Sequence, residues 1–206
     1  MGILIANTFH LLSVMVLFRL SLVIWRNHPQ RVLVSLLSAG LHVISPAGLF
    51  LTAPFAESSC ALFSFTGYLL YARSCLAVKT IARDGYLILA GLSFGVATAF
   101  RSNGILNGLP FAWEVLQVLP RLANSLFSTS SPWQEKGFPF TKIGGVRRLL
   151  ALGMGGIAVA AGSLVPQAVA YQRYCSDASG STQVPRRPWC QDHLPSIYTF
   201  VQRHYW

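Results

Sequence analysis

Charged residues are scarce in this sequence, and acidic ones are the scarcest. Its 206 residues include only 6 Asp and Glu, and charged residues make up 11% of the chain against 53% hydrophobic residues. Soluble domains carry about 25% charged residues, and disordered segments combine high net charge with low hydrophobicity. The composition, with a mean hydropathy of +0.50, excludes both classes and predicts a chain that lies in lipid.

Several short motifs that mark common chemistries are also missing. The sequence has no Walker A pattern, no nucleophile elbow and no acceptor site for asparagine-linked glycosylation. Its 4 Cys and 5 His show no metal-ligand spacing, so we expect no metal site. There is no detectable internal repeat, which disfavours a transporter built from two repeated halves.

The N-terminal region lacks the features of a cleavable signal peptide. The first apolar run is too long, has no basic segment before it, and is followed by Arg26 rather than by small residues. We therefore expect this run to stay in the protein as a membrane span.

The basic residues are explained by membrane topology. The 16 Lys and Arg give a net charge of +10, which in a soluble domain would suggest nucleic-acid binding. Here they cluster between the apolar runs, where the positive-inside rule places them. We therefore expect a membrane protein with no nucleic-acid partner.

The apolar runs predict an all-α, polytopic bundle of about six transmembrane helices. A hydrocarbon core of about 30 Å needs roughly 20 apolar residues in a helix. A sixth run, 104–119, is interrupted by Gly108 and Pro110 and carries Glu114, so it could instead be re-entrant. The five clearer runs are residues 3–25, 32–53, 60–78, 85–100 and 149–171.

Ten of the basic residues fall on one side of these spans, which we take as the cytosol. This predicts a multi-span membrane domain over residues 1–171, with a cytosolic loop at about 121–148. Residues 172–206 form a lumenal loop or tail. Cys175 and Cys190 lie in that tail, where an oxidising compartment permits a disulfide.

The loop after the second span is the first candidate site. Pro46 and Gly48 should kink or unwind the helix there. Glu57 then stands beside Ser58 and Ser59 at the start of the next helix. Two interpretations stay open: Glu57 serves a binding or catalytic site, or it is a helix N-terminal charge with a serine cap.

A second candidate lies after the fourth span. Arg101 could bind a phosphate bidentately, with Asn103 assisting. The alternative is an interfacial arginine that ends a span, with Asn-Gly forming the turn.

Two further patterns have structural or binding interpretations. Trp189 in the tail could stack on a sugar or belong to an interfacial aromatic belt. The pairs Gly91/Gly95 and Gly104/Gly108, and the cluster at 153–156, predict close helix packing rather than a phosphate loop.

Three stretches carry a resemblance to a known family. Residues 42–59 contain Ser-Pro-Ala-Gly and Ala-Glu-Ser, residues 97–104 read Ala-Thr-Ala-Phe-Arg-Ser-Asn-Gly, and Arg-Pro-Trp-Cys at 187–190 precedes an aromatic segment at 195–206. In this order they resemble the GPI mannosyltransferase 2 family. The resemblance implies a GT-C type membrane enzyme of the endoplasmic reticulum. It would transfer the second mannose, in α-1,6 linkage, from dolichyl phosphate mannose to the GPI lipid precursor, without a cofactor.

Residue by residue, the resemblance implies that Glu57, Ser58, Arg101 and Asn103 lie at or near the lumenal site. Family members carry an acidic residue, expected to be the catalytic base, in an upstream lumenal loop, and nothing before His42 supplies it. We therefore expect a partial chain, truncated at both ends, in which Glu57 is the candidate base by elimination.

Other classes remain as alternatives. The chain could be a non-catalytic membrane subunit or scaffold of a glycosylation complex in the endoplasmic reticulum, or a small lipid transporter. A small accessory membrane subunit is a further partner to consider for the enzyme.

Overall fold

The computed structural model describes residues 2–45, 56–127, 142–176 and 188–190, together with positions 196, 200 and 203–204. The regular structure of this part is entirely helical, which confirms the all-α expectation. The long helices are α1 Gly2–Ile24, α2 Arg31–Ile44, α4 Glu57–Leu76, α5 Thr80–Phe100, α6 Leu109–Phe127 and α7 Lys142–Tyr171. Shorter turns are η1 Ser102–Gly108, η2 Gln172–Ser176 and η4 Pro188–Cys190.

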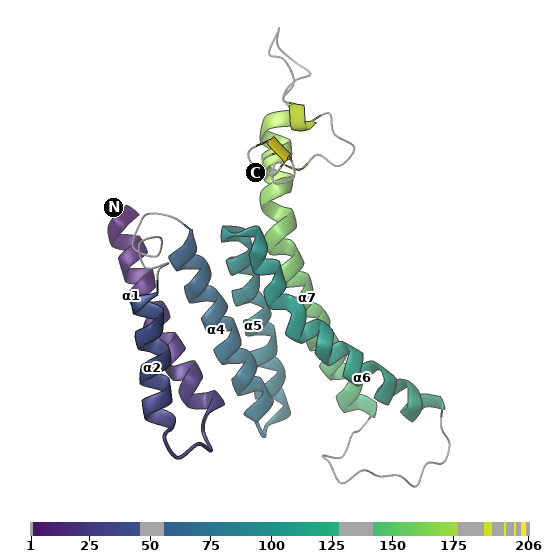
Figure 1. Ribbon diagram of the computed structural model, residues 1–206. Helices are drawn as coiled ribbons and strands as arrows, with labels where there is room; N and C mark the ends of the chain where they lie inside the picture. The colour runs from purple at the N-terminus through teal and green to yellow at the C-terminus, as the bar shows by residue number, and fades with distance from the viewer. Residues whose placement is uncertain are drawn as a thin grey trace.

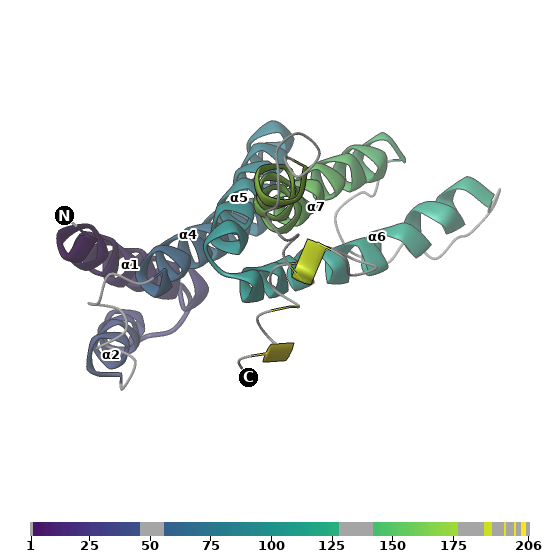
Figure 2. The same cartoon turned by 90° about the horizontal axis from the view of Figure 1, so that it is seen from above.

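The helices form a row rather than a closed bundle. Helix α5 packs against α4 on one side and α7 on the other, α1 packs against α4, α2 against α1, and α6 against α7. Seen from above, the order α2, α1, α4, α5, α7, α6 follows one curved layer (Figure 2). Such a layer leaves two broad faces without a protein neighbour among the described helices.

Those faces are apolar. Leu4, Ile44, Ile81 and Ile157 are between 70% and 82% exposed, and other large hydrophobic side chains are exposed on every long helix. Contiguous exposed apolar surface of this extent is not stable in water. Two helical segments, Gly2–Ile24 and Ile143–Cys175, are long and apolar enough to cross a membrane. Only these two of the about six expected spans are supported by helix length and hydropathy in the described residues.

The helices differ from the expected spans in their boundaries. Helix α5 begins at Thr80 rather than at residue 85, α7 begins at Lys142 rather than at residue 149, and α2 differs most. Helix α2 has 14 residues and ends at Ile44 instead of reaching residue 53, so at 1.5 Å per residue it extends only about 21 Å. Ser45 adopts the extended backbone, φ −59° and ψ 148°, that a residue before proline requires. The helix therefore breaks before Pro46, while Pro46 and Gly48 lie outside the described residues.

The run at 104–119 is not one helix. Residues up to Gly108 belong to the 3-10 turn η1, and α6 begins at Leu109 and continues to Phe127. Pro110 occupies the first turn of α6, where a missing N–H costs nothing. The interruption expected inside the span is therefore located at the start of α6.

The core forms where α5 meets α7 and α6. Leu87, Ala90 and Phe94 of α5 are fully buried with Leu152 of α7 and Phe111 of α6. This cluster is the apolar centre of the row.

Glycines allow α5 and α7 to approach closely. A Cβ on Gly91 would meet the backbone of Gly155, and one on Gly95 would meet the carbonyl group of Ala158. The packing role expected for Gly91 and Gly95 is confirmed. Gly104 packs in the same way against the backbone of Thr98, which lets η1 fold back on α5.

A buried ionic network joins four helices, α4, α5, α6 and α7. Arg148 of α7 is 8% exposed and donates to Glu114 of α6 at 2.5 Å and to Ser74 of α4 at 3.0 Å. Tyr71 donates to the same carboxylate at 3.2 Å, and Arg147 bonds Asp84 of α5 at 2.6 Å. The charge of Glu114 is thus compensated by a neighbouring helix.

We expect Gly95→Ala to destabilise the protein by about 1–3 kcal/mol, because the new methyl group overlaps the backbone of α7. Gly85→Ala on the same helix is the matched control, since no atom lies within 4 Å of its Cβ position. Thermal unfolding of both variants in detergent measures the effect. Equal melting temperatures for the two variants would contradict the close α5–α7 contact.

Candidate functional site

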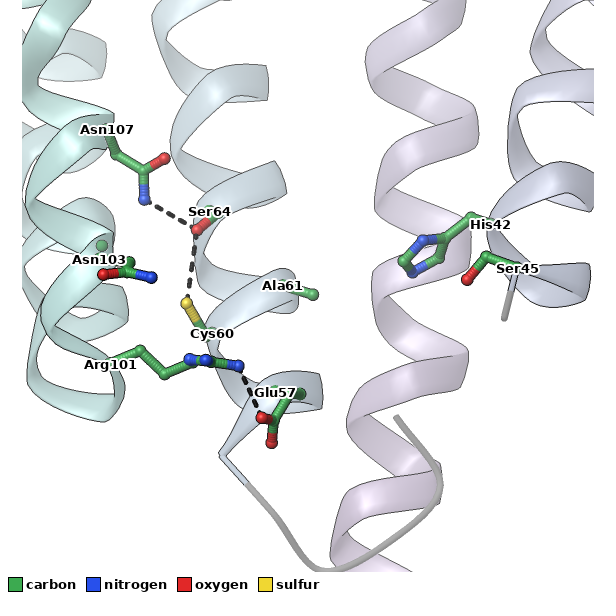
Figure 3. A pocket seen from close by; sticks show the side chains of 10 residues that line it. His42, Ser45, Glu57, Cys60, Ala61, Ser64, Arg101, Asn103 and Asn107 are labelled. Atoms are coloured by element: carbon green, nitrogen blue, oxygen red, sulfur yellow. Dashed lines mark hydrogen bonds and ion pairs between the residues drawn. The ribbon is translucent and has the colours of Figure 1, made fainter. Parts of the chain in front are cut away.

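A polar cavity of about 450 Å³ opens between α2, α4 and η1. The start of α4 contributes to it, whereas Ser74 of the Arg148 network lies near the other end of the same helix; α4 begins at the upper side of Figure 1. Figure 3 shows the side chains that surround it. They are His42, Ser45, Glu57, Cys60, Ala61, Ser64, Arg101, Asn103, Gly104 and Asn107.

An ion pair stands at one side of this cavity. Arg101 Nη1 donates to Glu57 Oε1 at 2.6 Å, and the side chains are 44% and 27% exposed. Glu57 is the first residue of α4 and Arg101 directly follows the last residue of α5. Because α4 and α5 are neighbours that run in opposite directions, these two helix ends meet (Figure 1).

The backbone around Arg101 is held on both sides. Its amide donates to the carbonyl oxygen of Ala97 at 3.0 Å, and its own carbonyl oxygen accepts from the amide of Gly104 at 2.8 Å. Arg101 itself is extended, with φ −144° and ψ 130°. The guanidinium group is therefore carried on a short, hydrogen-bonded turn between α5 and η1.

One face of α4 supplies the floor of the cavity. Glu57, Cys60 and Ser64 follow one another at helical spacing, so they lie along the same face. Ser64 accepts a hydrogen bond from Asn107 Nδ2 at 2.8 Å, and Cys60 Sγ lies 4.0 Å from Ser64 Oγ. Asn107 thereby ties η1 to α4.

The opposite wall comes from α2. His42 and Ser45 face the Arg101 side across the cavity (Figure 3). His42 Nε2 lies 3.4 Å from Ser13 Oγ of α1, and its ring is 5.4 Å from that of His10 and 5.2 Å from that of Phe65. These contacts hold the imidazole between α1 and α4.

Three of the residues proposed from the sequence come together here: Glu57, Arg101 and Asn103. Ser58 does not line the cavity, because its side chain is fully buried and, among the described residues, its hydroxyl has no hydrogen-bond partner. The N-cap of α4 is Ala56, without a side-chain cap bond. The serine cap is therefore absent, whereas Glu57 stands in the first turn of α4, where its charge is favourable, and also forms the ion pair.

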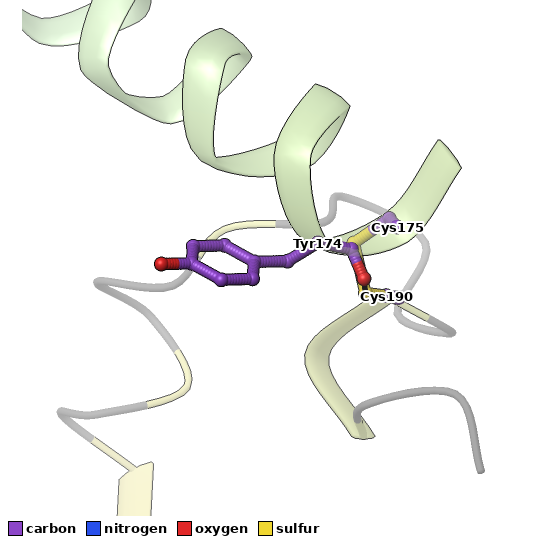
Figure 4. Close-up of a disulfide and its surroundings, with 3 residues drawn as sticks. All are labelled: Tyr174, Cys175 and Cys190. Carbon is purple, nitrogen blue, oxygen red and sulfur yellow. Dashed lines mark hydrogen bonds between the residues drawn. A yellow bond between two sulfur atoms is a disulfide. The ribbon is translucent and has the colours of Figure 1, made fainter. Parts of the chain in front are cut away.

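Trp189 lies elsewhere. It belongs to η4, is 4% exposed, and adjoins Cys190, which forms a disulfide with Cys175 at a Cα–Cα distance of 5.7 Å. Figure 4 shows this bridge at the end of α7, where Tyr174 precedes Cys175. The structure does not bring Trp189 to the residues that line the cavity, and its role in substrate binding stays a prediction.

Sequence reasoning missed six lining residues as parts of the site: His42, Ser45, Cys60, Ala61, Ser64 and Asn107. A signal existed for two of them. Cys60 and Ser64 lie three and seven residues after Glu57 on a predicted helix, which places them on the same face as Glu57. His42 and Ser45 lie in the stretch 42–59 that carries the resemblance, but no local pattern placed their side chains opposite Arg101.

The cavity combines one cation, one anion and neutral amide and hydroxyl groups. In the described part of the chain, no three His, Cys, Asp or Glu side chains are grouped to hold a metal ion. Guanidinium groups bind phosphate and amides bind hydroxyls, so this set suits a phosphorylated, hydroxyl-rich ligand. The fold and the cavity together define a helical membrane protein with a polar cavity.

The chain belongs to the family described as Mannosyltransferase (PIG-V), which matches residues 1–206. GPI mannosyltransferase 2 of Chaetomium globosum is 53% identical over 219 residues, covering 100% of this chain and 43% of that protein. The Aspergillus oryzae protein of the same name is 39% identical, with 98% and 43% covered. That of Yarrowia lipolytica is 30% identical, with 100% and 45% covered.

These matches confirm the resemblance that the motifs indicated. The chain spans less than half the length of these relatives. No solved structure matches it.

We expect the Glu57–Arg101 pair to add little to stability, because both side chains are partly solvated. Exposed ion pairs contribute up to about 1 kcal/mol. A double-mutant cycle with Glu57→Gln, Arg101→Gln and the double variant, followed by unfolding in detergent, gives the coupling energy. A coupling of about 3 kcal/mol, typical of a buried pair, would show instead that the pair holds the fold together.

Proposed function

We propose that this chain carries the donor-binding part of a GPI mannosyltransferase 2. The whole enzyme would transfer the second mannose of the GPI anchor, in α-1,6 linkage, from dolichyl phosphate mannose to the GPI precursor. The observation that carries the proposal is the polar cavity with Arg101 at its side, in a chain matched along its whole length by a mannosyltransferase family.

The proposed topology is a GT-C-like core of about six spans in the endoplasmic-reticulum membrane. Residues 1–171 would be the membrane domain, 121–148 would include the main cytosolic loop, and 172–206 would be lumenal. Support comes from the distribution of charge along the helices. The basic turns after α1 and α4 and the start of α7 lie at the lower side of Figure 1. The start of α4, which lines the cavity, and the end of α7, which is followed by the disulfide, lie at the upper side.

Arg101 is the proposed ligand of the donor phosphate. A guanidinium group has five N–H donors in a planar fork, and Nη1 is used for Glu57. No hydrogen bond within the described residues uses Nε or Nη2, which form another edge of the fork. That edge has the geometry for a bidentate contact with phosphate oxygens.

Glu57 is assigned a positioning role. In an inverting transfer, the acceptor oxygen bonds to the anomeric carbon as the bond from that carbon to the phosphate oxygen breaks, and a base takes the hydroxyl proton. Glu57 already accepts a short hydrogen bond from Arg101, so it orients the guanidinium group. The base would then be the acidic residue that family members carry in a further lumenal loop.

The topology predicts that the two free cysteines of α4 face different compartments. Cys60 lines the cavity and Cys75 lies near the other end of the same helix. In intact microsomes, a membrane-impermeant maleimide should label Cys75 only, and permeabilised microsomes should add Cys60. The variants Cys60→Ser and Cys75→Ser assign each signal. Labelling of Cys60 in intact microsomes would contradict the proposed orientation.

Activity is tested in a chimera in which this chain replaces the matched segment of the Chaetomium globosum relative. We expect it to restore growth of fungal cells that lack GPI mannosyltransferase 2, and to transfer labelled mannose in microsomes. Arg101→Gln should lower transfer by about 10- to 100-fold, the effect of losing a hydrogen bond to a charged group. Arg73→Gln, an exposed arginine at the far end of α4, is the matched control.

The same assay separates the two roles of Glu57. A positioning role predicts that Glu57→Gln mainly raises KM for the donor, whereas loss of a general base lowers kcat by about 100-fold or more. A chimera that folds and localises correctly but transfers no mannose would favour the alternative, a non-catalytic membrane subunit.

A further inference from the structure

Asn107 and Ser64 form a second polar group in the cavity that the phosphate contact does not use. Asn107 comes from η1 and Ser64 from the middle of α4. Their hydrogen bond of 2.8 Å connects side chains that are 43 residues apart in the sequence. Figure 3 shows both beyond Cys60, on the side away from Glu57.

The amide of Asn107 is only partly used. An asparagine side chain has two N–H donors and an oxygen that accepts two hydrogen bonds. One N–H is donated to Ser64, and no hydrogen bond within the described residues uses the other N–H or the oxygen. A fixed amide that offers a donor beside an acceptor is complementary to neighbouring hydroxyl groups of a sugar, each of which both donates and accepts.

The spacing along α4 agrees with a ligand that has a charged end and a sugar end. Glu57, which holds Arg101, and Ser64, which holds Asn107, are seven residues apart on one helix, or about 10 Å at 1.5 Å per residue. This is the length scale of one phosphate group joined to one sugar ring. The cavity volume of about 450 Å³ lies within the usual range for small-molecule sites.

We propose that Asn107, held in place by Ser64, reads the ring hydroxyls of the hexose whose phosphate Arg101 binds. Asn107 is then a specificity-determining residue for the sugar of a glycosyl phosphate lipid, and Ser64 is its positioning residue. This inference rests on the proposed function, since it assigns the sugar end of the same ligand. It separates recognition of the sugar from recognition of the phosphate, which falls to Arg101.

The first test measures sugar selectivity in the chimera, with dolichyl phosphate mannose and dolichyl phosphate glucose as donors. We expect Asn107→Ala to lower the ratio of kcat/KM for mannose over glucose by about 3- to 10-fold, the effect of losing one neutral hydrogen bond. Ser64→Ala should shift the ratio in the same direction by less. Arg101→Gln should lower kcat/KM for both donors by the same factor. Gln117→Ala, which removes an exposed amide of α6, should change kcat/KM for neither donor. Mannose and glucose differ only in the orientation of the 2-hydroxyl, so the expected change requires Asn107 to contact that hydroxyl, and an unchanged ratio in Asn107→Ala overturns the proposal.

The second test needs no catalysis and uses this chain purified in detergent. A short-chain mannosyl phosphate lipid should raise the melting temperature more than the matching alkyl phosphate without sugar. In Asn107→Ala the two lipids should raise the melting temperature equally, because only the phosphate is bound. In Arg101→Gln neither lipid should raise the melting temperature. If wild-type protein responds equally to the two lipids, Asn107 does not read the sugar and the proposal fails. Sugar-dependent binding together with an inactive chimera would instead refute the transferase activity alone.

Discussion

The close contact between α5 and α7 is the constraint on which the rest of the row depends. Gly91 and Gly95 leave no room for a side chain between the two helices, so α5 is held in a fixed position against α7. Its other side is fastened to α4, where Ser93 Oγ donates to the carbonyl oxygen of Phe63 at 2.8 Å. With both sides held, the end of α5 can only deliver Arg101 to the start of α4. The site is thus positioned by packing that contains no site residue.

The scarcity of acids has a structural counterpart. Of the six acidic residues in the chain, three lie in the described part, and each is paired with an arginine: Glu57, Asp84 and Glu114. Unpaired charges are costly at membrane depth, so helices that cross a bilayer tolerate acids mainly as pairs. The pairs of Asp84 and Glu114 connect α7 to α5 and α6. The pair of Glu57 is more solvated and stands at the cavity.

The sequence predicted three of the residues that line the cavity, but it did not predict how they meet. Glu57 and Arg101 stood out separately, as rare charges at the ends of apolar runs. Their ion pair spans 44 residues, and no local pattern reports such a contact. Likewise, Pro110 marked an interruption correctly, but whether it ended or began a helix depended on Gly104 folding η1 back onto α5. Tertiary packing decided both cases.

In the proposed phosphate site, the carboxylate of Glu57 stands beside the position of the anionic ligand. Without Glu57, Arg101 would be an isolated cation near the bilayer, free to adopt many rotamers. The pair fixes one edge of the guanidinium group and leaves another for phosphate, so less side-chain entropy is lost on binding. The cost is the repulsion between the carboxylate and the arriving phosphate, which weakens binding of any anion. If the proposed donor binds here, part of its affinity has to come from the sugar, and the Asn107–Ser64 pair is placed to supply that part.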